Sequence, residues 1–335
     1  MTATTMTTRP PADRPDRADG LDEEVDNDRY TELVARLSHQ SVVKHFDAYA
    51  DVAWDDPDFA IDPTDPRWEL AGDDPLGSTG WYRSQPPEVR ARLGLHSIVC
   101  KMKSGLQFEN VLKRGLLEYA FGLPDHSPEF RYTYHEVIEE AQHSLMFQEF
   151  VNRSGLEAAG LTWDLKIGSR MVVRMARSFP AMFFVFVLGG EDPIDHVQRR
   201  TLRSDKDLHP LIERIMRIHV TEEARHLSFA RQYLRQHVPQ LPWWRRQVIA
   251  HRAPMILGVM AGVMMRPPRE IVRTYAIPSD VIDEAYGPGT PSRQEVRNSL
   301  RKVRTLLTDL GLVTRSSKML WRRLGIWDEP TAPTA

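Results

Sequence analysis

The stretch that decides the fold is IHVTEEARHLSFA, residues 218–230. It places His219, Glu223 and His226 at positions i, i+4 and i+7, so their side chains share one helix face with residues that should pack a core. Burying a carboxylate beside two imidazoles costs free energy unless a partner compensates it. A metal ion is the partner that this pattern indicates, and other parts of the chain must then supply further ligands.

Helical spacing of apolar residues continues through most of the chain after residue 87. Proline, glycine and the apolar period predict these helices: 88–121, 128–152, 167–203, 210–237, 242–265 and 292–310. Pro180 and the run 189–193, which contains two glycines and a proline, are expected to kink or break the third helix. Convincing strand alternation is absent, so the chain is predicted to be an all-α helical bundle.

The composition of both ends differs from that of the middle. Pro, Asp, Gly and Trp dominate residues 50–90, which should form an irregular but ordered covering segment because Trp68 and Trp81 must pack somewhere. Thr, Pro, Asp and Arg dominate the N-terminus, which is expected to be disordered. The predicted organisation is a disordered tail, one helical domain and a second loose tail: residues 1–27, 28–325 (core bundle about 88–237) and 326–335.

The bulk composition excludes several classes of partner. The 335 residues carry a net charge of −2, so no broad basic field attracts nucleic acid or an anionic membrane. The single cysteine, Cys100, excludes a disulfide or a cysteine-based metal site within one chain and fits a reducing cytoplasm. The N-terminus lacks the apolar core of a secretory signal. The apolar run APMILGVMAGVMM, residues 253–265, is too short to span a bilayer and predicts a buried helix.

Four of the predicted helices carry acidic or imidazole groups inside their apolar stripes. Their order along the chain is Glu, Glu-x-x-His, Glu and Glu-x-x-His, at Glu109, Glu140/His143, Glu191 and Glu223/His226. This order builds a carboxylate-bridged dinuclear metal site in a four-helix bundle. Carboxylates neutralise two cations that repel each other, and imidazoles complete the coordination without adding charge.

Each motif alone has a plainer interpretation. One Glu-x-x-His is expected by chance, Glu109 alone fits an exposed charge, and a lone core histidine is more often satisfied by hydrogen bonds than by a metal. Glu191 follows FFVFVLGG, which makes a surface position less natural. Buried charges without partners are rare, so a purely structural bundle would need several coincidences at once.

Several neighbours of these residues have less certain roles. His219 stands one turn before Glu223 and would add a third imidazole. Glu136 stands one turn before Glu140, where it could be a ligand, a partner of a ligand or an acid on the helix flank. Glu139 and Glu222 point about 100° away from the stripe and are not expected to be ligands.

The pattern resembles the di-iron arylamine N-oxygenase family, typified by p-aminobenzoate N-oxygenase, and is especially similar to its chloramphenicol-pathway branch. The resemblance covers residues 90–310, and its distinguishing feature is the extra histidine, here His219. It implies a ferritin-like bundle, commonly a homodimer, in which Glu140 and Glu223 are shared between the metals. The implied ligands are Glu109, Glu140, His143, Glu191, His219, Glu223 and His226.

The resemblance also implies an activity. The family oxidises an aromatic primary amine to the nitro compound through hydroxylamine and nitroso stages, using two iron ions, O₂ as co-substrate and electrons from an external donor protein or reductant. Manganese is a further candidate because carboxylate and imidazole ligands accept both metals. Antibiotic biosynthesis is the expected context. Met102, Phe108, Phe147 and Phe184 could line an apolar channel, although ordinary core packing is the more common role.

Other functions are compatible with the same residues. The first is hydroxylation or desaturation of a C–H bond by the same kind of centre. The second is iron oxidation and storage, although ferritin chains are shorter and lack the additional helices predicted here. The arginines of the last predicted helix, Arg297, Arg301 and Arg304, favour a solvated basic face over a contact with a substrate carboxylate.

Overall fold

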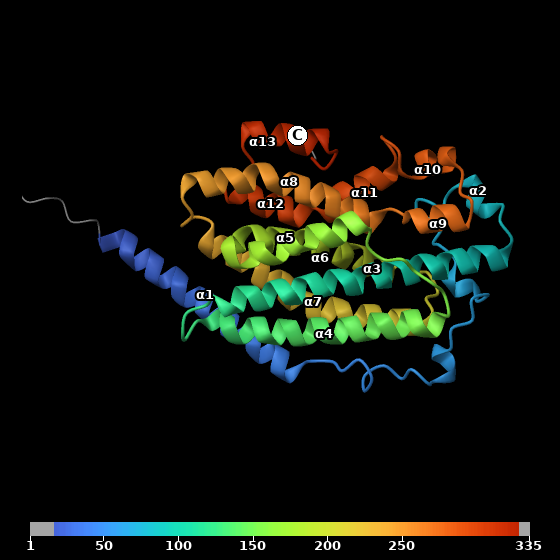
Figure 1. The fold of residues 1–335 in the computed structure, drawn as a ribbon, viewed down its shortest axis with the longest axis horizontal. Helices are drawn as coiled ribbons and strands as arrows, with labels where there is room; N and C mark the ends of the chain where they lie inside the picture. The colour runs from blue at the N-terminus through green and yellow to red at the C-terminus, as the bar shows by residue number, and fades with distance from the viewer. Residues whose placement is uncertain (1–16, 328–335) are drawn as a thin grey trace, which may run out of the picture.

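The computed structural model describes residues 17–327 of the chain, with side chains described from residue 27 onward (Figure 1). Long helices dominate this part of the molecule, and no strand occurs within it. The all-α prediction is therefore confirmed, and the arrangement is that of a ferritin-like helical bundle.

The bundle consists of α3 (Pro87–Phe121), α4 (Pro128–Ser154), α6 (Pro180–Arg203) and α7 (Pro210–His237). Each begins with a proline at its first or second position, where the missing N–H costs no hydrogen bond. Gly155 ends α4 in the left-handed conformation, with φ of 63°. Short loops join α3 to α4 and α6 to α7, and α3 packs against α6 as α4 packs against α7.

The third predicted helix is two helices in the structure, α5 (Trp163–Ser178) and α6, and the break falls just before Pro180 as expected. A kink or break was expected at residues 189–193, and the break is wrong because α6 runs through them without interruption. Gly190 serves close packing instead. A Cβ atom there would lie 1.9 Å from Cζ of Phe108, so the glycine lets α3 and α6 approach each other.

The structure contradicts the inner part of each predicted tail. Helix α1 (Arg17–Val43) replaces the predicted disorder from residue 17 onward and packs against α4 and α7, whereas residues 1–16 lie outside the described part. At the other end, Ile326 is buried and Trp327 packs on the core, so these two residues are not loose. The rest of that tail, residues 328–335, also lies outside the described part.

The segment between α1 and α3 is irregular and covers one end of the bundle. Trp68 is buried and stacks on His209 with ring centroids 4.1 Å apart, while Trp81 is half-buried. The tryptophans therefore pack as expected. The short helices of the segment are η1 (Pro57–Phe59), η2 (Pro66–Trp68) and α2 (Gly80–Arg83).

A second layer of helices follows the bundle, and α8, α11 and α12 of this layer pack on α6. Its members are α8 (Trp243–Met265), α9 (Arg269–Thr274), α10 (Ser279–Tyr286), α11 (Pro291–Ser299), α12 (Arg301–Asp309) and α13 (Arg315–Arg323). The single helix predicted for residues 292–310 is interrupted at Leu300. Helices α9, α10 and α13 were not predicted.

Helix α8 is longer than the apolar run 253–265. The stretch Trp243–Thr274, which contains α8 and α9, includes an 18-residue window with a mean hydropathy of 1.6, so by length and composition alone it could cross a membrane. The expectation of a buried helix holds for one face only, because Leu257 and Ala261 are buried whereas Met255 and Val259 are exposed. The buried face packs against α6 and α13, as in a helix of a soluble domain.

A polar layer divides the core of the bundle between two apolar clusters. Along α3, Met102 belongs to one cluster and Leu112 to the other, and Glu109 lies between them. Along α7, Ile215 and Phe229 mark the same two clusters. The apolar clusters thus shield a buried layer of charged groups from water on both sides.

Candidate metal centre

The seven residues expected as ligands lie together in this polar layer. All are buried, and none is more than 2% exposed. Their ligand atoms form overlapping groups within 4.8 Å of one another. The structure therefore brings together side chains from α3, α4, α6 and α7: Glu109, Glu140, His143, Glu191, His219, Glu223 and His226.

Two carboxylates occupy the middle of the cluster. Nδ1 of His143 lies 3.5 Å from an oxygen of Glu140 and 3.5 Å from an oxygen of Glu223. Nδ1 of His226 lies 3.2 Å from Glu140 and 3.1 Å from Glu223. Each carboxylate thus faces both imidazoles, which is the geometry that a carboxylate shared between two ions requires.

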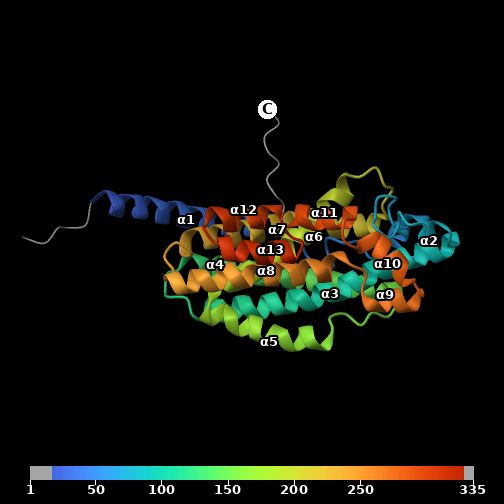
Figure 2. The same cartoon turned by 90° about the horizontal axis from the view of Figure 1, so that it is seen from above.

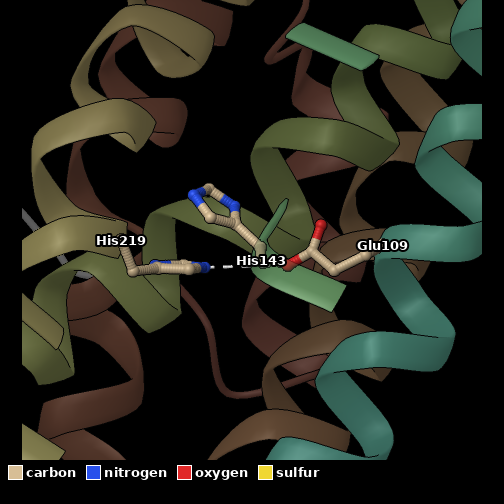
Figure 3. Close-up of side chains that lie close together, drawn as sticks. All are labelled: Glu109, His143 and His219. Carbon is tan, nitrogen blue, oxygen red and sulfur yellow. Dashed lines mark ion pairs between the residues drawn. The ribbon is translucent and has the colours of Figure 1, made fainter. Parts of the chain in front are cut away.

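His219, on α7, lies at the part of the cluster that faces α3 and α6. Its Nε2 atom lies 3.6 Å from Oε1 of Glu109 and 3.9 Å from Oε1 of Glu223. Figure 3 shows the ring pointing toward Glu109 with the His143 ring beside it, and the two ring centroids are 4.6 Å apart. A carboxylate oxygen of Glu191 lies within 4.8 Å of a ring nitrogen of His219 and of a carboxylate oxygen of Glu223.

Many polar atoms of the cluster have no hydrogen-bond partner, although a buried polar atom without a partner costs about 1–3 kcal/mol. The unpartnered atoms are Oε2 of Glu109, both carboxylate oxygens of Glu140, Nδ1 of His143, Oε1 of Glu191 and Oε2 of Glu223. All are acceptors or can be acceptors, and all belong to one cluster. Two cations would satisfy them together, so these residues fit a dinuclear metal centre.

The acids repel one another when no cation lies between them. Burial, followed by the charges of neighbouring carboxylates, raises the pKa of Glu109 and of Glu191 well above its usual value. Burial and repulsion therefore favour the protonated form of both acids in the metal-free protein. Cations would favour the charged form instead, which couples metal affinity to pH.

Two residues outside the expected ligand set fix the histidine rings. Nε2 of His143 donates a hydrogen bond to Glu222 over 2.9 Å, and Nε2 of His226 donates to Glu139 over 2.8 Å. These bonds leave the Nδ1 atom of each ring facing the cluster, where it could bind a metal ion once it carries no proton. Glu139 and Glu222 were expected not to be ligands, but their role as partners of the histidine rings was not predicted.

The bonds cross between helices. The two motifs are EEAQH on α4 and EEARH on α7, residues 139–143 and 222–226, and the first glutamate of each holds the histidine of the other. Arg225 in turn donates to Glu139. Burial alone would raise the pKa of Glu139, but the hydrogen bond from His226 and the nearby Arg225 lower it to about 2. The doubled glutamate was the sequence signal that could have revealed these partners.

His219 is held by a neutral partner instead. Its Nδ1 atom lies 3.0 Å from the side-chain oxygen of Gln198, to which it donates. Burial and then the positive charge of His143 lower the pKa of His219 well below its usual value. The ring is therefore neutral and presents its Nε2 lone pair to Glu109. No sequence signal distinguishes Gln198 from an ordinary helix glutamine.

A cavity of about 220 Å³ reaches this layer from the surface. Glu109, Glu191 and His219 line its inner end, whereas His143 and His226 do not contribute to it. The expected channel residues Met102, Phe108 and Phe147 line its walls. Phe184 does not, because it packs in an aromatic cluster with its ring centroid 4.3 Å from that of Tyr233. Three of the four residues that could line an apolar channel thus line the cavity, and the alternative of ordinary core packing holds for Phe184.

The outer end of the cavity is basic. Lys101 and Arg266 are exposed there, while Arg67 and Lys206 are half-buried. The lining residues include no carboxylate other than the two glutamates of the polar layer. The cavity therefore has an acidic inner end, apolar walls and a cationic outer end.

Comparison with known proteins identifies the family. Residues 27–311 match the family model described as p-aminobenzoate N-oxygenase AurF. The chain belongs to this family. It is also 40% identical over 306 residues to the uncharacterized protein Rv0885 of Mycobacterium tuberculosis and to the uncharacterized protein Mb0909 of Mycobacterium bovis, covering 91% of this chain and 90% of each relative. No solved structure matches the chain at a significant level.

Membership of the N-oxygenase family confirms the resemblance noted in the sequence. The matched residues include all four bundle helices and the whole polar layer. They also include α8 to α12, so all of the second layer except α13 is part of the family's domain.

Glu136 adds to the set that the family resemblance implies. It is buried, and its Oε2 atom has no hydrogen-bond partner. One of its carboxylate oxygens lies within 4.8 Å of a carboxylate oxygen of Glu140 and of a ring nitrogen of His226. Burial raises its pKa to about 8 although His226 opposes the shift. The possibility of an acid on the helix flank is excluded, and Glu136 belongs to the polar layer either as a ligand or as a partner of one.

Proposed function

We propose that this protein is an oxygenase that oxidises an aromatic primary amine to the corresponding nitro compound at a centre of two metal ions. The product forms through hydroxylamine and nitroso stages, and O₂ is the co-substrate. Family membership supports the oxygenase class. The observation that carries the proposal is the convergence of seven buried donor side chains, many of them unpartnered, at the inner end of an apolar cavity.

The ligand assignment follows from the ring nitrogens that face the layer. His143 and His226 would bind through Nδ1, and His219 through Nε2. Glu140 and Glu223 would be shared by the two ions, with Glu109 and Glu191 completing the set on the cavity side. When bound, iron, or manganese in its place, activates O₂ and accepts electrons from an external donor.

The chain itself positions the amine. The apolar walls of the cavity receive an aromatic ring and exclude water from the layer, which suppresses side reactions. Lys101 and Arg266 at the outer end would attract an anionic group of the substrate and so direct the opposite end, the amine, toward Glu109 and His219. The substrate class favoured is an aromatic amine that carries a carboxylate or another anion away from its nitrogen.

One experiment tests the proposal. Full-length protein loaded anaerobically with two equivalents of Fe²⁺ is mixed with O₂ and p-aminobenzoate, and products are separated by liquid chromatography and mass spectrometry. Nitroso or nitro product that carries label from ¹⁸O₂ is expected. Rapid iron oxidation without organic product would instead favour a ferroxidase, and hydroxylation of the ring would favour the C–H oxidising alternative.

The cellular setting of the activity is a separate proposal. A homodimer in the cytoplasm, acting in a pathway that makes a nitroaryl natural product, fits the family resemblance. The free, buried Cys100 suits a reducing compartment, and Trp163, Ile167 and Met171 form an exposed apolar stripe on α5 that a second copy could cover. Light scattering of the purified protein tests the dimer, and a monomer at micromolar concentration would contradict it.

A further inference from the structure

A basic patch lies on the side of the bundle where α7 meets α12. It consists of Arg231 and Arg235 of α7 and Arg301 and Lys302 of α12, which surround a surface hollow of about 350 Å³. Arg235, Arg301 and Lys302 are exposed. Neither Arg235 nor Arg301 makes an ion pair in the part of the chain that the structure describes. Asp309 is the one acidic residue that lines the hollow.

The patch connects directly to the polar layer. The guanidinium of Arg231 donates a hydrogen bond to Asp192, which is buried on α6. Asp192 follows Glu191 in the chain, and Glu191 lines the inner end of the cavity. Lys302 lies 3.9 Å from Asp195, one turn farther along the same helix. One hydrogen bond and one peptide unit therefore link the surface at the patch to a residue of the metal layer.

The position of the patch separates it from the substrate path. The cavity is lined mainly by residues of α3, α6, the first half of α7 and the end of α8. Its residues on α7 end at His219, whereas Arg231 and Arg235 lie near the other end of that helix, and none of the four residues of the basic patch lines the cavity. A protein bound at the patch would leave the outer end of the cavity free. The net charge of the chain is −2, so the patch is a local feature and not part of a general basic surface.

We infer that the basic patch is the docking site of a small acidic electron-transfer protein that reduces the metal centre. The inference rests on the proposed function, which creates the need for such a donor. Oxidation of an amine to a nitro group by two molecules of O₂, with two molecules of water as the other product, balances only when two electrons and two protons enter from outside. A one-electron donor is oxidised once per encounter, so two encounters would supply the two electrons that a centre of two iron ions would accept.

Charge complementarity between partners accelerates their encounter, and this acceleration is lost when salt screens the charges. The test replaces two cations that have no role inside the protein, in the double variant Arg235→Glu/Arg301→Glu. The control is Arg170→Glu/Arg174→Glu, which makes the same charge change at exposed positions of α5. Figure 2 shows α5 and α12 on opposite sides of the molecule.

The first measurement is the rate at which a reduced plant-type [2Fe–2S] ferredoxin reduces the diferric protein, followed by absorbance. At about 20 mM salt, the patch variant should be reduced at least about tenfold more slowly than the unaltered protein, and this difference should shrink at about 500 mM salt. Dithionite, which needs no docking site, should reduce the unaltered protein, the patch variant and the α5 control at the same rate. An unchanged ferredoxin rate in the patch variant, or an equal loss in the α5 control, would overturn the inference.

The second measurement uses metal-free protein, so that it does not depend on the proposed function. Binding of oxidised ferredoxin, measured by calorimetry at low salt, should weaken at least about tenfold in the patch variant and not in the control. Absence of ferredoxin binding to the unaltered protein, or tighter binding of a DNA duplex to the same patch, would overturn the docking site. If patch-dependent binding occurs but the protein holds no iron, the proposed function fails and the docking site stands.

Discussion

The metal layer has two sides that are built differently. On the side of α4 and α7, here the closed side, His143 and His226 are buried and each is held by a carboxylate from the opposite helix. The other side faces α3 and α6 and is here called the open side. There, His219 of α7 is held by the neutral amide of Gln198 and lines the cavity with Glu109 and Glu191.

The partners of the rings set their chemistry. Burial alone would lower the pKa of His143, but Glu140 and Glu222 raise it to about 9, whereas burial and a neighbouring imidazole lower the pKa of His219. A ring held by an anion is a stronger electron donor to a metal than one held by an amide. Under the proposed function, the closed side would retain the ions and the open side would expose them to O₂ and substrate.

The largest effect is expected from the shared carboxylates. Glu223→Ala removes an oxygen that faces His143, His219 and His226 at once, so the content of iron after anaerobic loading should fall from about two ions to fewer than one per chain. Elemental analysis after desalting measures this. The control Glu284→Ala, at an exposed position on α10, should retain both ions. Full loading of the Glu223 variant would remove that residue from the ligand set.

The next effect concerns the partners on the closed side. Glu139→Gln together with Glu222→Gln keeps the hydrogen-bonding shape but removes both charges, and the affinity for Fe²⁺ should fall about 10–100-fold. Competition with a chromophoric chelator measures it. Gln198→Ala on the open side should change the affinity less. If Gln198→Ala lowered the affinity for Fe²⁺ more than the double variant does, the closed side would not be the side that retains the ions.

Packing beside the open side can be broken at one glycine. In Gly190→Ala the added methyl would meet the ring of Phe108, so the free energy of unfolding of the metal-free protein should fall by about 1–3 kcal/mol. The matched control is Gly262→Ala on α8, where a Cβ meets nothing within 4 Å, and here stability should rise by about 0.5–1 kcal/mol. Urea denaturation measures both. Equal effects of the two changes would show that α3 and α6 are not closely packed there.

The pH dependence of the metal-free protein provides a smaller test. The pKa of Glu136 rises from 4.5 to about 8 on folding, so the folded state binds its proton more tightly than the unfolded state does. Its contribution to stability is complete below about pH 4.5 and is lost as pH rises toward 8. The melting temperature of Glu136→Gln should consequently decline less between pH 5 and pH 8 than that of the unaltered protein. If the melting temperatures of the two proteins declined in parallel, the raised pKa of Glu136 would be contradicted.

The smallest effect on metal content is expected at His219. Its partner is neutral and the four carboxylates remain, so His219→Ala should retain nearly two ions but change the rate at which the reduced, loaded protein consumes O₂. An oxygen electrode and elemental analysis measure the two properties on one sample. An unaltered rate would remove His219 from the ligands.

The bundle was predictable because proline and glycine mark its helix ends and the apolar stripes mark its faces. The starts at Pro128 and Pro210 agree with the predictions, and all seven expected ligands occupy one layer. Helix α1 was missed because its residues are mostly polar, and the short helices α9 and α10 because tertiary contacts, rather than a long apolar period, stabilise them.

The partners of the ligands could not be predicted from one helix at a time. Projection of α4 alone places Glu139 off the stripe, and only the position of α7 shows that it meets His226. The same holds for Gln198, whose role depends on the packing of α6 against α7. Spacing along a helix identifies which side chains share a face, whereas hydrogen bonds between helices depend on the assembled fold.

The crossed pairing of EEAQH and EEARH has a consequence for protein synthesis. The ring of His143 acquires its anionic partner only when Glu222 is in place, about 80 residues later in the chain. A nascent chain that ends after α4 possesses one glutamate–histidine motif with neither the opposing carboxylate nor the second motif. If the layer binds iron as proposed, the ribosome must complete α7 before the ions can be held in their final geometry, and loading would wait until all four bundle helices have been made.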